Sequence, residues 1–149
     1  MNNTMLLVED NPTDEKLTLR AFRTRSTAVN IVVVRDGVEA LDYLFGTGAY
    51  AGRDTSSQPG LILLDVKLPR VDGLEVLVRI RADERTRAVP VVILTASLEE
   101  QDVVRSYLLG VNAYVRKPVD FAEFVKTAET IGHFWLTLNE APPRPRTTS

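Results

Sequence analysis

Five short apolar runs recur along the chain, and each is followed by a segment whose apolar residues have helical spacing. The runs occupy residues 4–8, 29–34, 61–64, 89–94 and 112–115. They are nearly continuous in valine, isoleucine and leucine, which is typical of strands covered on both faces. Strands that alternate with helices in this way predict a doubly wound α/β fold with a five-stranded parallel sheet, whose usual strand order is 2-1-3-4-5.

The expected helices have explicit start signals. Each begins with a capping side chain and has an acid three residues later. The pairs are Asn11/Asp14, Asp36/Glu39, Asp72/Glu75, Ser97/Glu100 and Asp120/Glu123. A cap oxygen accepts an otherwise unpaired backbone N–H, and the acid favours the positive end of the helix dipole. The caps therefore support five helices after five strands.

Two segments depart from this alternation. Residues 46–60 are rich in glycine, serine and threonine, which predicts a long surface loop. Residues 139–149 contain three prolines and no periodicity, which predicts a flexible tail. We expect one domain over residues 1–138, with no room for a separate output domain.

Composition narrows the chemistry. The net charge is −2 and there is no cysteine, so thiolate sites and disulfides are excluded. A single histidine, His133, makes a histidine-rich metal site or a Ser-His-Asp triad improbable. The near-neutral charge argues against a nucleic-acid partner, and the lack of a long apolar run argues against a membrane span. We expect a cytoplasmic domain that works through carboxylates, hydroxyls and lysines.

Acidic residues follow two strands that are central neighbours in the expected sheet. Glu9 and Asp10 follow the first run, and Asp65 follows the third. Ligands of such sheets bind at the carboxyl ends of the strands, so these side chains are expected to converge. Carboxylates about 4 Å apart repel by about 4 kcal/mol per pair at an effective dielectric near 20. A hard divalent cation would relieve this repulsion, and Mg²⁺ fits the donor set.

A hydroxyl and an ammonium are expected at the same edge. Thr95 and Lys117 end the fourth and fifth runs, and together they can hold a phosphoryl group. The inferred reaction is attack by an Asp65 oxygen on phosphorus, which gives an aspartyl phosphate. Each residue alone has a simpler interpretation: Asp65 as a helix cap, Thr95 as an ordinary strand residue and Lys117 as a surface charge.

Several short motifs resemble those of response-regulator receiver domains over about residues 4–138, because they occur in the same order and at the ends of the predicted strands. They are residues 6–12 (LLVEDNP), 63–65 (LLD), 68–69 (LP) with 72–73 (DG), 90–96 (PVVILTA) and 117–118 (KP). The resemblance implies a flavodoxin-like receiver that accepts a phosphoryl group from a sensor histidine kinase, with Mg²⁺ as cofactor. Its surface would then switch to signal to partners.

The resemblance also assigns roles to residues. Asp65 would be the phosphoacceptor, and Mg²⁺ would be held by Asp65, Glu9, Asp10 and the backbone carbonyl of Lys67. Thr95 would be the switch hydroxyl, and Lys117 would contact the phosphoryl group. Two further implied features are a switch aromatic at Tyr114, which could otherwise be simple edge-strand packing, and a peptide bond before Pro118 that is often cis in the family. Glu9 stands where the family often has aspartate, and Lys67 and Ser97 occupy positions that tune phosphoryl loss.

Shorter features look like regulators paired with bacterial phytochromes. They are residues 34–37 (VRDG), the loop at 46–60 and Phe134-Trp135 in an extended last helix. These features suggest a bacteriophytochrome histidine kinase as the partner. His133 lies off the apolar stripe of its helix, so it is expected to be solvated and the phosphodonor must be another protein.

The apolar face of the last helix turns toward its end. Phe121, Phe124, Val125 and Ala128 form the expected core face, and Ile131, Phe134, Trp135 and Leu138 form a second patch about 80° away. The second patch either covers the end of the sheet or binds a partner. We expect it to support a homodimer.

Three alternatives remain in view. A phosphatase of the haloacid-dehalogenase type also forms an aspartyl phosphate, but it needs an acid where this chain has Lys67. A nucleotide switch needs a glycine-rich phosphate loop, and residues 9–13 (EDNPT) contain no glycine. A pseudo-receiver that is never phosphorylated would be a pure binding module. Apart from its own phosphorylation and dephosphorylation, we expect no enzymatic activity.

Overall fold

The computed structural model describes residues 3–23 and 29–143. Strands and helices alternate in this order: β1 (Thr4–Val8), α1 (Pro12–Arg23), β2 (Asn30–Val34), α2 (Gly37–Phe45), β3 (Leu61–Leu64), α3 (Gly73–Ala82), β4 (Val91–Thr95), α4 (Glu100–Leu108), β5 (Ala113–Arg116) and α5 (Phe121–His133). A π-helical turn, Phe134–Leu138, continues α5. The strands form a parallel sheet in the order β2-β1-β3-β4-β5, which confirms the expected fold class and strand order.

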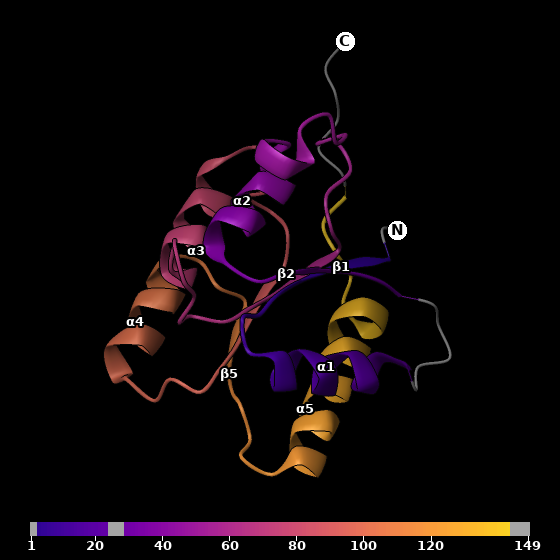
Figure 1. Cartoon of the computed structure of the whole chain (residues 1–149), viewed down its shortest axis with the longest axis vertical. Helices are drawn as coiled ribbons and strands as arrows, with labels where there is room; N and C mark the ends of the chain where they lie inside the picture. Colours follow the sequence, from indigo (N-terminus) through magenta and orange to yellow (C-terminus); the bar gives the residue numbers. More distant parts are fainter. Residues whose placement is uncertain (1–2, 24–28, 144–149) are drawn as a thin grey trace.

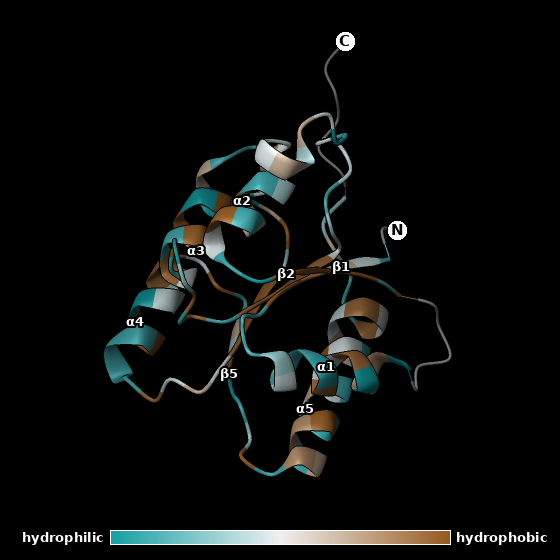
Figure 2. Cartoon of the chain, in the orientation of Figure 1, coloured by the Kyte–Doolittle hydropathy of each residue, from teal (hydrophilic) through white to brown (hydrophobic). Residues whose placement is uncertain are grey.

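The sheet lies between two layers of helices (Figure 1). Helices α1 and α5 pack side by side on one face, and α2, α3 and α4 cover the other. Every residue of β3 and β4 is buried, as the continuous apolar runs predict. The helices carry apolar residues toward the sheet and polar residues away from it (Figure 2). Each face of the sheet therefore has its own hydrophobic core.

The register of the sheet aligns the strand ends that carry the candidate site. Val8 lies opposite both Val34 and Leu64, so the residues that follow β1 and β3 emerge side by side. The N–H of Asp65 donates to the carbonyl of Val8 at 3.2 Å. At the other side of the sheet, the N–H of Lys117 donates to the carbonyl of Thr95 at 2.7 Å. The carboxyl ends of β1, β3, β4 and β5 thus meet at one edge of the sheet.

Four of the five expected caps are present. The side chains of Asn11, Asp36, Asp72 and Asp120 accept backbone N–H groups at the starts of α1, α2, α3 and α5. The expected cap at Ser97 is wrong. Helix α4 begins at Glu100, so Glu99 occupies the N-cap position, and its side chain makes no cap bond. Ser97 Oγ accepts the N–H of Glu99, just before the helix, at 3.4 Å and donates to Asp102 Oδ2 at 2.7 Å.

The loop at 46–60 contains a short 3₁₀ turn, Gly48–Tyr50. The guanidinium of Arg53 holds the loop against α2: it donates to the carbonyl of Ser57 at 2.7 Å and lies 4.2 Å from the ring centre of Tyr43. The expected loop is therefore present, and a single arginine orders it by satisfying several backbone carbonyls.

The last helix differs from the sequence prediction. Ile131 is buried in the core beside Phe124, and Trp135 is half-buried against the same core. Phe121, expected in the core, is 64% exposed at the first position of α5. Only Phe134 and Leu138 of the expected patch are exposed, at 45% and 61%.

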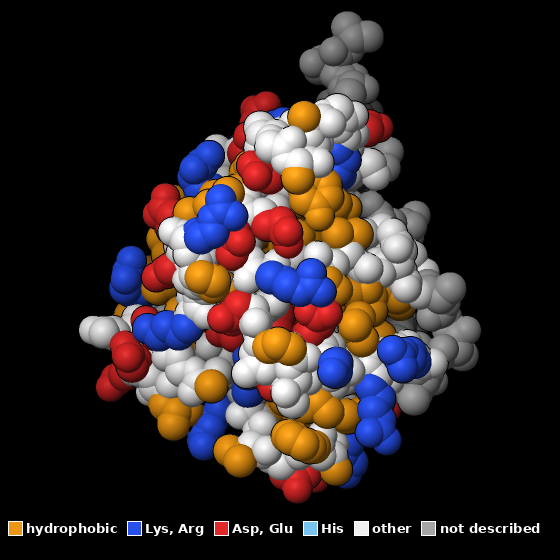
Figure 3. All heavy atoms as spheres, in the orientation of Figure 1, with side chains coloured by type: hydrophobic (Ala, Val, Ile, Leu, Met, Phe, Trp, Pro, Cys, Tyr) orange, Lys and Arg blue, Asp and Glu red, His pale blue; other side chains and the backbone are white. Residues whose placement is uncertain are grey.

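Toward the C-terminus, residues 140–143 have no helical or strand structure, and residues 144–149 of the expected tail lie outside the described residues. Charged side chains of both signs are interspersed over the face seen in Figure 3. None of the helices formed by residues 3–23 and 29–143 is long and apolar enough to cross a membrane.

Candidate functional site

Three carboxylates meet where β1 and β3 end. Ligand oxygens of Glu9, Asp10 and Asp65 all lie within 4.8 Å of one another. Glu9 is 2% exposed and Asp65 is 6% exposed, whereas Asp10 is exposed to solvent. Oxygen donors at this spacing match the requirements of a hard divalent cation. The structure thus brings together the acids that the sequence predicts at this edge.

Lys117 lies among buried carboxylates. Its ammonium is 2.6 Å from Asp65 Oδ2, 2.8 Å from Glu9 Oε1 and 2.9 Å from Asp14 Oδ2. Burial lowers the pKa of Lys117, but the charge of Asp65 and the hydrogen bonds to Asp65, Glu9 and Asp14 outweigh it and raise the pKa well above its usual value. Lys117 is therefore charged at neutral pH, and its charge offsets the repulsion among the acids.

Glu9 titrates near neutrality. Burial raises the pKa of Glu9 to about 7, against the opposing effect of the hydrogen bond from Lys117. The backbone N–H of Asn11 also donates to Glu9 Oε2 at 3.2 Å. A cation bound here would favour the ionised form of Glu9, so metal binding and proton release are linked.

The hydroxyl of Thr95 already contacts the expected acceptor. Thr95 is fully buried, and its Oγ1 donates to Asp65 Oδ1 at 2.7 Å. The N–H of Lys67 reaches the same oxygen at 3.3 Å. Thr95 and Lys117 therefore each contact one oxygen of the Asp65 carboxylate, the group that the sequence predicts as the phosphoacceptor.

Tyr114 lies beside this group on β5. Its ring is half-buried, and its hydroxyl donates to the carbonyl of Ser97 at 3.2 Å. The N–H of Ser97 donates to Thr95 Oγ1 at 3.3 Å, so Tyr114 and Thr95 are joined through one residue. Burial raises the pKa of Tyr114, so the phenol stays protonated.

The bond between Lys117 and Pro118 is trans, since no peptide bond between described residues is cis. The family resemblance had suggested a cis bond there, and in this structure that expectation is wrong.

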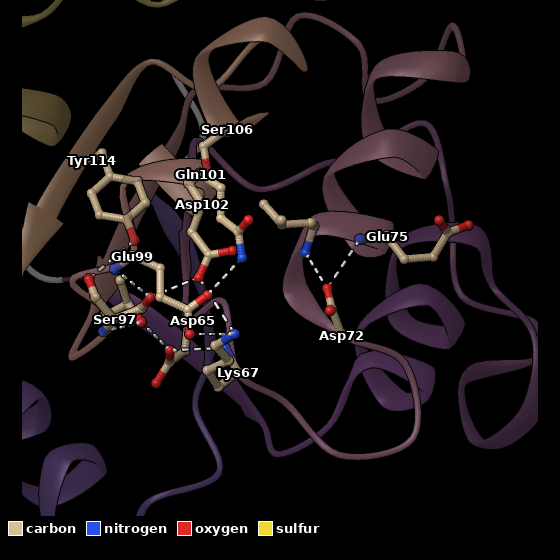
Figure 4. Close-up of polar contacts among 12 residues, drawn as sticks. Asp65, Lys67, Asp72, Glu75, Ser97, Glu99, Gln101, Asp102, Ser106 and Tyr114 are labelled. Carbon is tan, nitrogen blue, oxygen red and sulfur yellow. Dashed lines mark hydrogen bonds and ion pairs between the residues drawn. The ribbon is translucent and has the colours of Figure 1, made fainter. Parts of the chain in front are cut away.

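Sequence reasoning missed two acids of this region. Asp14 was assigned only to the start of α1, but its carboxylate contacts Lys117. Asp102, in α4, is 5% exposed and contacts both Ser97 Oγ and Lys67 Nζ (Figure 4). Asp14 could have been found, since the first turn of a helix that follows a strand lies at the same sheet edge. Asp102 lies far along the chain, and no local pattern marks it.

The groups expected in a phosphoryl-accepting regulator are therefore present around Asp65, namely an ammonium, a hydroxyl and two further acids at the same edge. Residues 5–129 match the family model of the response regulator receiver domain, and the chain belongs to this family.

Among curated relatives, the chain is 44% identical to the probable methanogenesis regulatory protein FilR2 of Methanothrix harundinacea, over 93% of this chain and 86% of the relative. It is 39% identical to the response regulator Rcp1 of Synechocystis, over 89% of this chain and 88% of Rcp1.

Solved structures agree with this assignment. The phosphorylated cyanobacterial phytochrome response regulator RcpA superposes with a TM-score of 0.90 at 38% identity, covering 96% of this chain and all of RcpA. The Mn²⁺-bound form of Rcp1 superposes with a TM-score of 0.88 at 36% identity, covering 94% of this chain and 99% of the Rcp1 chain. The bacteriophytochrome response regulator AtBRR superposes with a TM-score of 0.72 at 54% identity, covering 94% of this chain and 99% of the AtBRR chain.

Proposed function

We propose that Asp65 accepts a phosphoryl group from a phosphohistidine of a sensor histidine kinase, and that the site then signals through the surface of this chain. The observation that carries the proposal is the arrangement around Asp65, in which Thr95 and Lys117 each contact a different carboxylate oxygen. Phosphorylation of a relative with the same fold, RcpA, supports it.

The chemistry follows from the positions of these groups. A carboxylate oxygen of Asp65 attacks phosphorus, the P–N bond of the phosphohistidine breaks, and the histidine nitrogen takes a proton from solvent. The Thr95 hydroxyl and the Lys117 ammonium then donate to phosphoryl oxygens, where charge-assisted hydrogen bonds stabilise the dianion. Two such bonds are worth about 3–6 kcal/mol, since each contributes roughly 1.5–3 kcal/mol. Because both groups already contact the unphosphorylated carboxylate, only the gain over those contacts counts toward the ~5.5 kcal/mol needed to invert a two-state equilibrium from 1:99 to 99:1.

The metal proposed for the site is Mg²⁺. Glu9, Asp10, Asp65 and the backbone carbonyl of Lys67 would hold it, and the close approach of the three carboxylates supports this fit. Bound Mg²⁺ would neutralise charge on the transferred phosphoryl group. The Mn²⁺-bound form of Rcp1 supports a divalent cation at such a site.

The proposed partner is a bacteriophytochrome histidine kinase in the cytoplasm. The relatives RcpA and AtBRR are described as phytochrome and bacteriophytochrome response regulators, which supports this pairing. We also propose a homodimer that uses the exposed Phe134 and Leu138. We propose no nucleic-acid partner, because the net charge of −2 is close to neutral. The phosphatase alternative is not favoured, because the side chain of Lys67 pairs with acids of the α4 region.

Phosphotransfer tests the proposal. The chain is mixed with autophosphorylated bacteriophytochrome kinases and with unrelated histidine kinases, each in the presence of Mg²⁺. We expect rapid label transfer from a bacteriophytochrome kinase and none to Asp65→Asn. Transfer at equal rates from every kinase would refute the phytochrome pairing, and no transfer from any kinase or from acetyl phosphate would refute phosphorylation itself.

A further inference from the structure

A buried carboxylate outside the acceptor cluster joins two loops that flank the site. Asp102, on the first turn of α4, is 5% exposed. Its Oδ2 accepts a hydrogen bond from Ser97 Oγ at 2.7 Å and lies 3.4 Å from Lys67 Nζ. The three side chains converge in Figure 4, with Glu99 beside them. A carboxylate this deeply buried needs its partners, so the contacts are not incidental.

Each partner of Asp102 lies two residues beyond a side chain of the acceptor site. Lys67 follows Asp65, and its backbone N–H donates to Asp65 Oδ1 at 3.3 Å. Ser97 follows Thr95, and its N–H donates to Thr95 Oγ1 at 3.3 Å. The backbone of both loops therefore contacts the acceptor site, whereas both side chains turn to α4.

The ammonium of Lys67 can pair with either of two groups of acids, those of the α4 region and those of the acceptor site. In this structure it pairs with Asp102 and lies 3.9 Å from Glu99 Oε1, and these contacts raise its pKa, the hydrogen bond to Asp102 most of all. The side chain is 58% exposed. Without Asp102, the ammonium keeps the longer and more exposed contact to Glu99, and a phosphoryl group on Asp65 is the competing negative group, because the Lys67 backbone already contacts the Asp65 carboxylate.

We propose that Asp102 is a positioning residue that holds the Lys67 ammonium on α4 and thereby leaves the phosphoryl group of Asp65 open to hydrolysis. The inference rests on the proposed phosphorylation of Asp65. In hydrolysis, a water oxygen attacks phosphorus, the bond between phosphorus and the Asp65 oxygen breaks, and Asp65 regains its carboxylate. Both protons of the water leave with the phosphate as dihydrogen phosphate.

Loss of the Asp102 charge redirects Lys67. Its ammonium then pairs with the phosphoryl oxygens and covers the side from which water approaches, so the aspartyl phosphate survives longer. Before phosphorylation, the same ammonium lies against the carboxylate cluster and competes with a divalent cation. A purely structural role of Asp102 in α4 would change stability, but it would not act through Lys67.

A double-mutant cycle separates these roles. The proteins are the wild type, Asp102→Asn, Lys67→Met and the double variant, with Glu100→Gln as the matched control, because Glu100 is an exposed acid on the same turn. Each is phosphorylated with acetyl phosphate and Mg²⁺, the donor is removed, and loss of the phosphoryl group is timed. Asparagine keeps an acceptor for Ser97, and thermal unfolding checks that each variant is folded.

We expect Asp102→Asn to slow phosphoryl loss about two- to fivefold, as for the loss of a partly exposed ion pair. In the Lys67→Met background the same change is expected to have no effect, and Glu100→Gln is expected to match the wild type. Asp102→Glu keeps the charge, so it should restore the wild-type rate. Calorimetric titration of the unphosphorylated proteins with Mg²⁺ should show weaker binding for Asp102→Asn only while Lys67 is present.

Two results would overturn the inference. One is an equal effect of Asp102→Asn with and without Lys67. The other needs no substitution: the ¹⁵N signal of Lys67 Nζ in the wild type should change little when beryllofluoride and Mg²⁺ are added, and a large shift would mean that Lys67 leaves Asp102 for the acceptor. If no protein takes up phosphoryl, the proposed function fails, and the Mg²⁺ cycle still tests the positioning of Lys67.

Discussion

Removal of the Lys117 ammonium should leave three carboxylates crowded at one sheet edge. In Lys117→Met, Asp65, Glu9 and Asp14 lose a charge that lies 2.6–2.9 Å from their oxygens. Each contact is worth about 6 kcal/mol at an effective dielectric of 20, before the cost of burying the charges. Removal of one partner from a buried ion pair costs about 3–5 kcal/mol in measured cases. We expect a loss of this size in metal-free protein at about pH 8.

The loss should depend on pH, because Glu9 can take up a proton. Burial holds the pKa of Glu9 at about 7 in the folded protein, above its ordinary value of 4.5, and loss of Lys117 raises it further. A raised carboxyl pKa contributes stability that is present below the unfolded value and is lost as the pH rises through the folded value. The variant should therefore be least stable above pH 7 and should recover toward pH 5.

Urea unfolding in EDTA at about pH 5.5 and about pH 8 measures the effect. The control is Lys126→Met, which removes an exposed lysine of α5 and should change the free energy of unfolding by less than about 0.5 kcal/mol. Added Mg²⁺ should restore part of the stability of Lys117→Met. An equal loss at both pH values, or a loss below about 1 kcal/mol, would refute the view that Lys117 neutralises this cluster.

Three further predictions concern the metal, the fold and the assembly. Mg²⁺ affinity should rise as the pH increases through about 7, because the cation binds ionised Glu9, whose pKa burial raises to about 7; calorimetry at pH 6 and 8 that gave one affinity would contradict this. Gly73→Ala should destabilise the fold by about 2 kcal/mol or more in urea unfolding, since its Cβ would lie 2.1 Å from the Asp65 carbonyl oxygen; wild-type stability would contradict it. We expect the wild type to sediment as a dimer and the double variant Phe134→Ala, Leu138→Ala as a monomer, and identical sedimentation would exclude this interface.

The fold was predictable because its signals are local. The first four strands are runs rich in β-branched residues or leucine, and four of the five helix starts carry a side-chain cap that the structure contains. Strand order then follows from the alternation of strands and helices. The convergence of Glu9, Asp10 and Asp65 follows from the same rule, because the register aligns the ends of β1 and β3.

The contacts that the sequence did not predict join residues that are far apart along the chain, and they also depend on the side-chain rotamers. Asp14 and Asp102 look like ordinary helix-start acids, and only packing shows that one contacts Lys117 and the other Lys67. Serine is a common N-cap residue, which is why the sequence predicts a cap at Ser97, but the Ser97 hydroxyl donates to the carboxylate of Asp102. Helical periodicity also placed Phe121 in the core, although this side chain, at the first position of α5, is exposed to solvent.

The most direct test of the account is the mass of the protein after treatment with acetyl phosphate and Mg²⁺. The account predicts one added phosphoryl group, found on the peptide that contains Asp65 after borohydride reduction, and no addition in EDTA. Asp65→Asn should gain nothing. A phosphoryl group on another residue, or equal labelling of wild type and Asp65→Asn, would contradict the claim that Asp65 is the acceptor.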